Sequence, residues 1–148
     1  MRAVLITLML VAALSGCTML YKREYVTESP QQLSPQETEE VFRAFRDYLL
    51  IKGMQPLGHK SPEELDRSVA FRIAGSDAGF ALRGDWEDIL ELSYSGGSNF
   101  QLRLFRMVHR PGADFSDEYL KRFVERSEEY LREATKRPIR LRLVPSPT

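Results

Sequence analysis

The hydrophobic and polar positions follow a helical period in two segments of the chain. Across residues 34–53 apolar side chains recur every three or four positions, and "SPQE" at 34–37 has the pattern of a capping box with proline at the first helical position. Across residues 114–137 an apolar stripe lies between an acidic start, with Ser116 or Asp114 as N-cap, and a basic end. The two patterns predict amphipathic helices that each bury one face.

From residue 68 onward the period changes to two. Alternating or continuous apolar runs bounded by Gly, Asp, Ser or Pro are typical of strands. They occur at "SVAFRI", at Phe80 and Leu82 after "GSDAG", at "WEDILELSY", at "FQLRLFRMVH" and at "IRLRLV".

The turn "SGGS" at 95–98 connects two of these strands and suggests their register. Pairing Tyr94 with Phe100 sets Glu91 against Arg103 on one face of the hairpin. On the other face the same register aligns the leucines, Leu90 with Leu104 and Leu92 with Leu102. With this register both faces of the hairpin agree, whereas a slip by one residue would exchange the two faces.

The order of elements is therefore helix, four strands, helix, strand. This order favours an α+β fold, a two-layer sandwich with both helices on one face of a largely antiparallel sheet of four to five strands.

A different pattern precedes these elements. Residues 3–14 form an unbroken apolar run, preceded by Arg2 and followed by Ser15 and Gly16. A permanent transmembrane helix needs roughly 20 apolar residues, so this shorter run is typical of a removable export signal.

The run ends in "LSGC", which contains Cys17, the only cysteine of the chain. A hydrophobic residue, a small residue, Gly and Cys in this order resemble the lipobox of bacterial lipoproteins. The resemblance covers residues 1–17 and implies that residues 1–16 are removed and that Cys17 carries a diacylglyceryl group. The alternative is that Cys17 is one more small residue of an ordinary signal peptide or of a short anchor helix.

The resemblance also implies a location. The residue after the cysteine is Thr18. In enteric bacteria an Asp at this position tends to retain lipoproteins in the inner membrane. We therefore expect a protein anchored by Cys17 in the outer membrane and facing the periplasm, or on the outer face of a cell with a single membrane. Two or more acyl chains give stable anchoring.

Residues 17–33 are polar with isolated apolar residues, and they predict a flexible lipidated tether. The alternative is a binding arm that uses Leu20, Tyr21 and Tyr25. The predicted single domain then spans 34–148, and a fragment starting near Leu33 is expected to fold alone.

Composition excludes some partners. Without residues 1–16 the chain has 20 basic and 21 acidic side chains, so it lacks the basic character of a nucleic-acid-binding protein. The two histidines, His59 and His109, have no metal-type spacing, and we expect no metal, no cofactor and solvent-exposed positions for both.

One acidic segment invites a catalytic hypothesis. "GDWEDILE" contains Asp85, Glu87, Asp88 and Glu91, and paired carboxylates can hydrolyse glycosidic bonds. Strand alternation separates these side chains, so a solvated strand entry is the preferred interpretation. Trp86 has a core-facing parity and predicts packing rather than ligand stacking.

The predicted register points to a surface. Ile89 falls opposite Phe105 on the face away from the helices, with Met107 beside them and Arg103 among the charged neighbours. An apolar spot rimmed by charge is a candidate partner site, although single apolar residues on a solvent face are ordinary.

The sequence thus predicts a non-catalytic binding or scaffolding module, anchored to the membrane through Cys17, with an envelope protein or peptidoglycan as partner. The alternative is an envelope hydrolase that acts on peptidoglycan or a related substrate. A lipid carrier would need an open interior, which the large aromatic stripes disfavour.

Overall fold

The structure is a computed structural model of the chain, and its description covers residues 19–58, 66–73, 87–108 and 114–145. A six-stranded sheet has the order β2-β3-β4-β5-β1-β6, and every neighbouring pair is antiparallel. The strands are β1 (Met19–Glu28), β2 (Gln55–Pro56), β3 (Ser68–Ile73), β4 (Glu87–Ser93), β5 (Gln101–Val108) and β6 (Arg140–Leu143).

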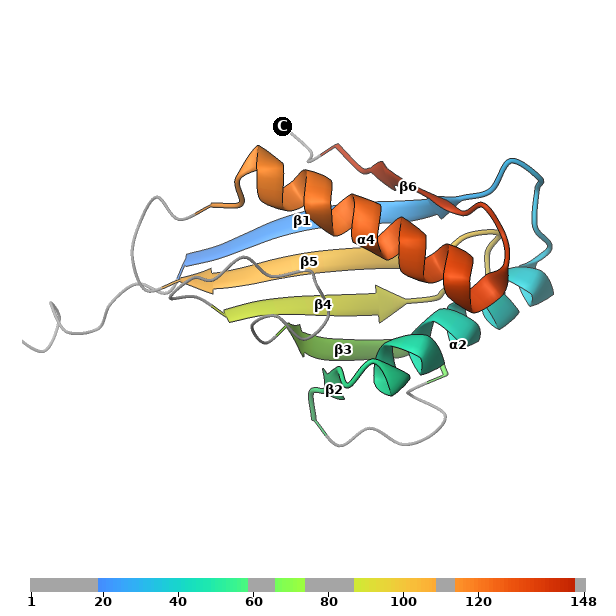
Figure 1. Cartoon of the computed structure of the whole chain (residues 1–148), viewed down its shortest axis with the longest axis horizontal. Coiled ribbons are helices and arrows are strands. Elements are labelled where there is room, and N and C mark those ends of the chain that lie inside the picture. Colours follow the sequence, from blue (N-terminus) through green and yellow to red (C-terminus); the bar gives the residue numbers. More distant parts are fainter. Residues whose placement is uncertain (1–18, 59–65, 74–86, 109–113, 146–148) are drawn as a thin grey trace, which may run out of the picture.

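Helices α2 (Pro35–Ile51) and α4 (Asp117–Thr135) both pack on one face of this sheet (Figure 1). The predicted two-layer α+β sandwich is therefore confirmed. The described sheet has six strands rather than four to five.

Both predicted helix starts are confirmed at atomic detail. The Ser34 hydroxyl accepts a hydrogen bond from the Glu37 amide, and the Glu37 carboxylate accepts one from the Ser34 amide at 2.8 Å. The hydrogen bond from the Ser34 amide is the largest cause that lowers the pKa of Glu37. In α4 the N-cap is Ser116, which accepts from the Tyr119 amide, so Asp114 is not the cap. The caps satisfy amides that the first helical turn leaves without partners.

The hairpin register is also confirmed. Leu90 pairs with Leu104, Glu91 with Arg103 and Ile89 with Phe105. Gly96 in the turn has φ +88°, a conformation that favours glycine.

The core lies between the helices and the sheet. Its fully buried side chains come from both layers: Phe42, Phe45 and Leu49 of α2, Phe123 and Leu131 of α4, and Phe71, Leu90, Leu92, Leu102 and Leu104 of the sheet. Phe42 meets Phe100 edge to face, with 5.4 Å between ring centroids. This geometry is favourable for aromatic pairs.

The predicted tether over 17–33 is wrong for residues 19–28, which form β1. This strand lies inside the sheet between β5 and β6, and Tyr25 belongs to the core. The domain boundary at residue 34 is wrong for the same reason. The charged residues of β1 made it look like a polar spacer in the sequence. In the structure Lys22 and Glu24 occupy alternate positions on the solvent side, as expected for a half-buried strand.

Several predictions lie outside the described residues. They are the signal peptide and Cys17, the strand with Phe80 and Leu82, Trp86, Asp85, His59 and His109.

Candidate functional site

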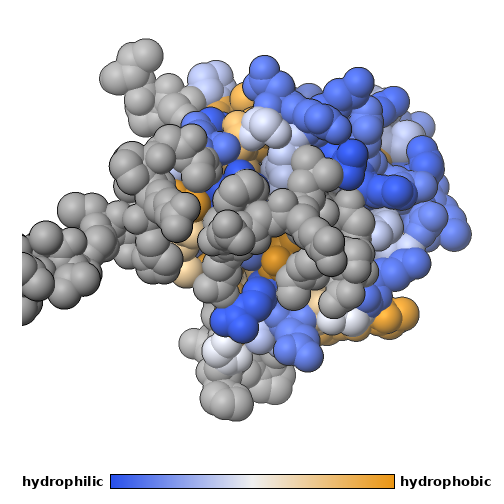
Figure 2. All heavy atoms as spheres, turned by 60° about the vertical axis from the view of Figure 1, so that its left-hand side comes forward, coloured by the Kyte–Doolittle hydropathy of each residue, from blue (hydrophilic) through white to orange (hydrophobic). Residues whose placement is uncertain are grey.

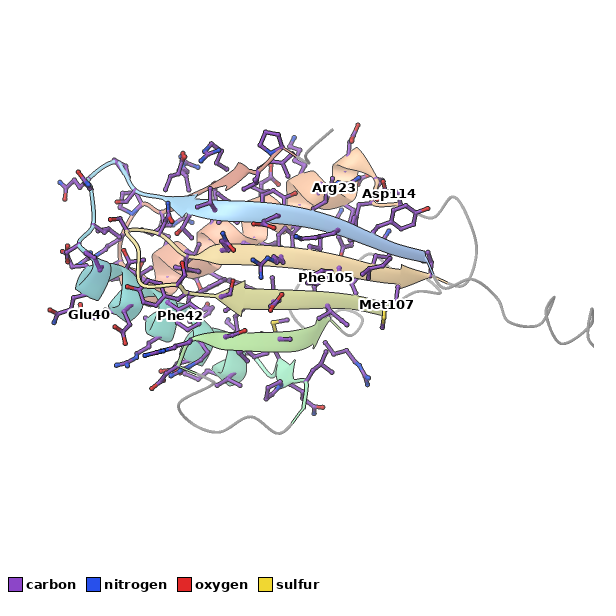
Figure 3. The ribbon with its side chains drawn as sticks, turned by 180° about the vertical axis from the view of Figure 1, so that it is seen from behind. Arg23, Glu40, Phe42, Phe105, Met107 and Asp114 are labelled. Carbon is purple, nitrogen blue, oxygen red and sulfur yellow. The ribbon has the colours of Figure 1, made fainter. Side chains whose placement is uncertain are left out.

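The face of the sheet opposite the helices has no described helix over it, and we refer to it as the open face (Figure 3). Strand alternation and the cross-strand registers assign the residues whose side chains lie on this face. They are Leu20, Lys22, Glu24, Val26 and Glu28 of β1, Ser68, Ala70 and Arg72 of β3, Ile89, Glu91 and Ser93 of β4, Gln101, Arg103, Phe105 and Met107 of β5, and Arg140 and Arg142 of β6.

Four apolar residues gather at one end of the open face, and we call them the open-face cluster: Leu20, Ile89, Phe105 and Met107. Met107 pairs with Leu20 on one side, and Phe105 pairs with Ile89 on the other. Leu20 is 61% exposed, and the other three are half-buried. Figure 3 shows Phe105 and Met107 toward the end of β5, where β1 begins.

The structure thus brings together the three apolar residues that the sequence predicted, and it adds Leu20 to them. The sequence analysis placed Leu20 in a tether, or in a binding arm as the alternative, and therefore did not predict its pairing with Met107 in the sheet. Figure 2 turns this end of the molecule forward from the helix side, so the open face points away from the viewer, and it shows hydrophilic residues over the right of the view.

Arg103 lies at the centre of a charged row beside the open-face cluster. Its Nε is 3.3 Å from Glu24 Oε2, its Nη1 is 3.5 Å from Glu91 Oε2, and its Nη2 donates to Gln101 Oε1 at 2.6 Å. Lys22 Nζ is 2.8 Å from the same Glu24 oxygen. The hydrogen bond from Lys22 is the largest cause that lowers the pKa of Glu24, with attraction to both cations adding to it.

The charged row is therefore paired within the sheet, and such partly exposed pairs add little to stability. Arg103 borders the apolar cluster, as predicted, but its guanidinium is already engaged on three sides. Its present partners fix its position at the rim.

Arg140 and Arg142 of the edge strand β6 also lie on the open face, as predicted. Arg142 pairs with Glu28, and Arg140 Nη1 is 2.7 Å from Glu128 of α4. The Glu128 carboxylate also accepts a hydrogen bond from the backbone N–H of Leu141 at 2.9 Å. This carboxylate from the helix layer satisfies an amide of the edge strand, which limits further strand pairing there.

A buried ionic network lies on the opposite, covered face. Arg106 Nε and Nη2 donate to the two oxygens of Asp88 at 2.8 and 2.9 Å, and the Tyr119 hydroxyl donates to Asp88 Oδ2 at 2.5 Å. Asp88 and Arg106 are each 2% exposed. The guanidinium lies over the rings of Phe115 and Tyr119, at 4.4 and 4.7 Å from their centroids.

Burial raises the pKa of Tyr119 well above its ordinary range, and the bond to Asp88 adds to this effect. The prediction that Asp88 lies at a solvated strand entry is therefore wrong. The signal was present in the sequence, since the register that pairs Leu90 with Leu104 also sets Asp88 opposite Arg106 on the inward face.

The carboxylates of "GDWEDILE" that the structure describes do not converge. Asp88 points into the core and bonds Arg106 and Tyr119, whereas Glu91 lies on the open face near Arg103. Within the described ranges, no group of three or more His, Cys, Asp or Glu side chains could hold a metal ion. No described helix is long and apolar enough to cross a membrane.

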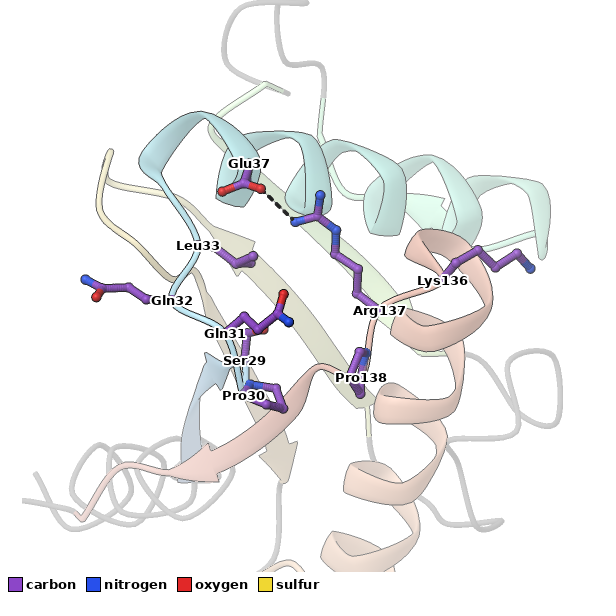
Figure 4. A pocket seen from close by; sticks show the side chains of 9 residues that line it. All are labelled: Ser29, Pro30, Gln31, Gln32, Leu33, Glu37, Lys136, Arg137 and Pro138. Atoms are coloured by element: carbon purple, nitrogen blue, oxygen red, sulfur yellow. Dashed lines mark hydrogen bonds and ion pairs between the residues drawn. The ribbon is translucent and has the colours of Figure 1, made fainter.

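A polar cleft of about 370 Å³ lies between the start of α2 and the turn after α4 (Figure 4). Arg137 Nη1 and Glu37 Oε1 are 3.5 Å apart across it. The lining is exposed or half-buried, and it consists of Ser29, Pro30, Gln31, Gln32, Leu33, Glu37, Lys136, Arg137 and Pro138. None of these polar side chains is buried and directed into the cleft, so it has less of the character of a binding site than the open face.

A scan against protein-family models and a search of curated proteins found no match to this chain.

Proposed function

We propose that the protein is a non-catalytic binding module of the cell envelope. It is anchored through acylated Cys17 in the outer membrane, on the periplasmic side, and its open face contacts another envelope component, an envelope protein or peptidoglycan. The observation that carries this proposal is the open face itself: a broad sheet surface with an apolar cluster that no described helix covers.

The nature of this surface supports binding rather than catalysis. Its apolar part consists of contiguous cross-strand partners on three strands, and the charged row beside it is internally paired. Exposed apolar patches with a polar rim are typical of interaction sites. A sheet also holds such side chains in fixed positions, which lowers the entropic cost of binding.

The anchoring is tested by mass spectrometry of the protein extracted from membrane fractions. We expect a mature N-terminus at Cys17 that carries the mass of the diacylglyceryl group and acyl chain, and loss of this species in Cys17→Ala. A mature chain with another N-terminus, or with a free Cys17 thiol, would contradict the anchoring.

The binding surface is tested by a photoreactive amino acid placed in living cells. Position 101 lies on the open face, and position 121 lies on the exposed side of α4 and serves as the matched control. We expect a discrete crosslinked envelope component from position 101 and none from position 121. Equal crosslinking from both positions, or from neither, would contradict a role for the open face.

A further inference from the structure

The anchor leaves almost no chain between the membrane and the sheet. Only Thr18 separates Cys17 from Met19, the first residue of β1. Two residues of extended chain span at most about 7 Å. If Cys17 is acylated, the first residues of β1 therefore lie at the level of the lipid headgroups, rather than at the end of a spacer.

The open-face cluster lies at this same end of the sheet. Leu20 is the second residue of β1, Met107 is its cross-strand partner near the end of β5, and Ile89 is near the start of β4. The opposite end of the open face carries the polar residues Ser93 and Gln101, and the apolar side chain beside them, Val26, is buried. The open-face cluster therefore lies at the end of the sheet nearest to Cys17. This position indicates that the surface in contact with the cluster is the membrane.

We infer that the open-face cluster rests on the bilayer to which Cys17 is anchored, with Leu20 and Met107 nearest the acyl chains. This inference rests on the proposed function, since it requires the lipid on Cys17. It leaves the polar end of the open face available to an envelope partner.

A weak affinity of the cluster for lipid is sufficient for this arrangement. The anchor converts membrane contact into an intramolecular step, so the local lipid concentration is high and a few apolar side chains decide the orientation. The charged row has balanced partners, so the contact depends on apolar burial and not on anionic headgroups. It should therefore persist in phosphatidylcholine vesicles and at high salt.

The lone cysteine makes a clean test possible, because acylation consumes its thiol. The lipoprotein is purified from membranes in detergent, and one new thiol is introduced at Lys22→Cys, beside the cluster, or at Ser95→Cys, in the turn at the far end of the sheet. Each is labelled with a polarity-sensitive fluorophore and reconstituted into phosphatidylcholine vesicles that contain a lipid-borne quencher. We expect blue-shifted emission and at least several-fold stronger quenching at position 22 than at position 95.

A substitution in the open-face cluster then tests whether the cluster causes the stronger quenching at position 22. Leu20→Glu places a charge on the most exposed cluster residue, and Ile51→Glu places one on a residue of α2 that is 82% exposed, outside the cluster. In the Lys22→Cys background, Leu20→Glu should abolish the excess quenching, and Ile51→Glu should leave it unchanged.

The outcomes separate the two proposals. If the wild-type chain takes up label, its Cys17 thiol is free and the anchoring in the proposed function fails. If the wild-type chain takes up no label, its mature N-terminus is the lipidated Cys17, and positions 22 and 95 are quenched equally, the anchoring stands and the membrane contact is overturned. Crosslinking of position 22 to an envelope protein in cells, combined with equal quenching in vesicles, would assign the cluster to a protein partner instead.

Discussion

Asp88 and Arg106 face each other across β4 and β5 on the covered side of the sheet, joined by two hydrogen bonds of 2.8 and 2.9 Å and almost completely buried. Successive residues of β4 point to opposite faces of the sheet. Glu91, three residues after Asp88, therefore lies on the open face, where it pairs with Arg103. The same hairpin therefore carries two cross-strand ion pairs in opposite environments.

The two pairs should respond very differently to loss of the acid. Asp88→Ala leaves the Arg106 charge buried without its carboxylate, and we expect it to lower the free energy of unfolding by about 3–5 kcal/mol. The matched change Glu91→Ala, on the open side, should cost less than about 1 kcal/mol. Chemical denaturation of both variants measures this, and similar losses would contradict the buried placement of Asp88.

The tyrosine of the buried network should produce a measurable pH dependence. The pKa of Tyr119 is raised from its ordinary value of 10.0, so above that pH the unfolded chain loses a proton that the folded protein keeps. The stability that this tyrosine contributes is fully present below pH 10 and falls as the pH rises further, by up to about 1.4 kcal/mol per pH unit.

Tyr119→Phe removes the hydroxyl that titrates. The wild type should be more stable than the variant by about 1–3 kcal/mol at neutral pH, because the variant loses a buried hydrogen bond to Asp88. The difference should narrow above pH 10, measured by urea denaturation at several pH values. A difference that stays constant to pH 11 would show that Tyr119 ionises equally in both states.

The start of the domain can be tested by truncation. Thr27 joins β1 to the hairpin through its backbone N–H and hydroxyl, which both bond to the carbonyl of Phe100. A chain beginning at Leu33 lacks β1, exposes the edge of β5 and should show no cooperative unfolding, whereas a chain beginning at Thr18 should unfold in one transition. Cooperative unfolding of the shorter chain would restore the tether interpretation.

Two serines of the second helix should give effects of opposite sign. The Ser127 hydroxyl is fully buried and has no hydrogen-bond partner among the described residues, so Ser127→Ala should stabilise the protein by about 0.5–1 kcal/mol. Ser116 caps the same helix, and Ser116→Ala should cost about 1 kcal/mol. Thermal unfolding compares them, and a destabilised Ser127→Ala would reveal a bond partner.

The open-face cluster should contribute little to folding. Phe105→Ser combined with Met107→Ser is expected to cost about 1–2 kcal/mol, because both side chains are only partly buried. Leu104→Ala, one position away on the covered face, should cost about 2–5 kcal/mol. A double variant that is as unstable as Leu104→Ala would place Phe105 and Met107 in a core and not on a surface.

Much of the architecture is local enough to be predicted from the sequence. The capping box at Ser34 and the N-cap at Ser116 determine where the helices begin, since the hydrogen bonds join residues three apart. The hairpin register follows from a short turn and the alternation of leucines, and it correctly assigns Ile89, Phe105 and Met107 to one face. The apolar spot was predictable because all three residues belong to adjacent strands of one hairpin.

Two features depended on distant partners and were missed. The two-residue strand β2 has no period of its own, and it exists only as a partner of β3. The charged residues of β1 are typical of a polar spacer. The segment forms a strand because it pairs with β5 and β6, which lie far from it in the sequence.

The amino-acid sequence by itself determined the export-signal pattern that ends at Cys17, the two capped helices, and the faces of the central hairpin on which its leucines and Ile89, Phe105 and Met107 lie. Only the tertiary structure decided that β1 lies between β5 and β6 and that Leu20 pairs with Met107. It also decided that the Tyr119 hydroxyl donates a hydrogen bond to Asp88, the partner of Arg106. The physical reason is the range of the interactions. Caps and turns are made between neighbours in sequence, whereas a strand in the interior of a sheet and a buried charge are stable only when segments far apart in the chain satisfy them.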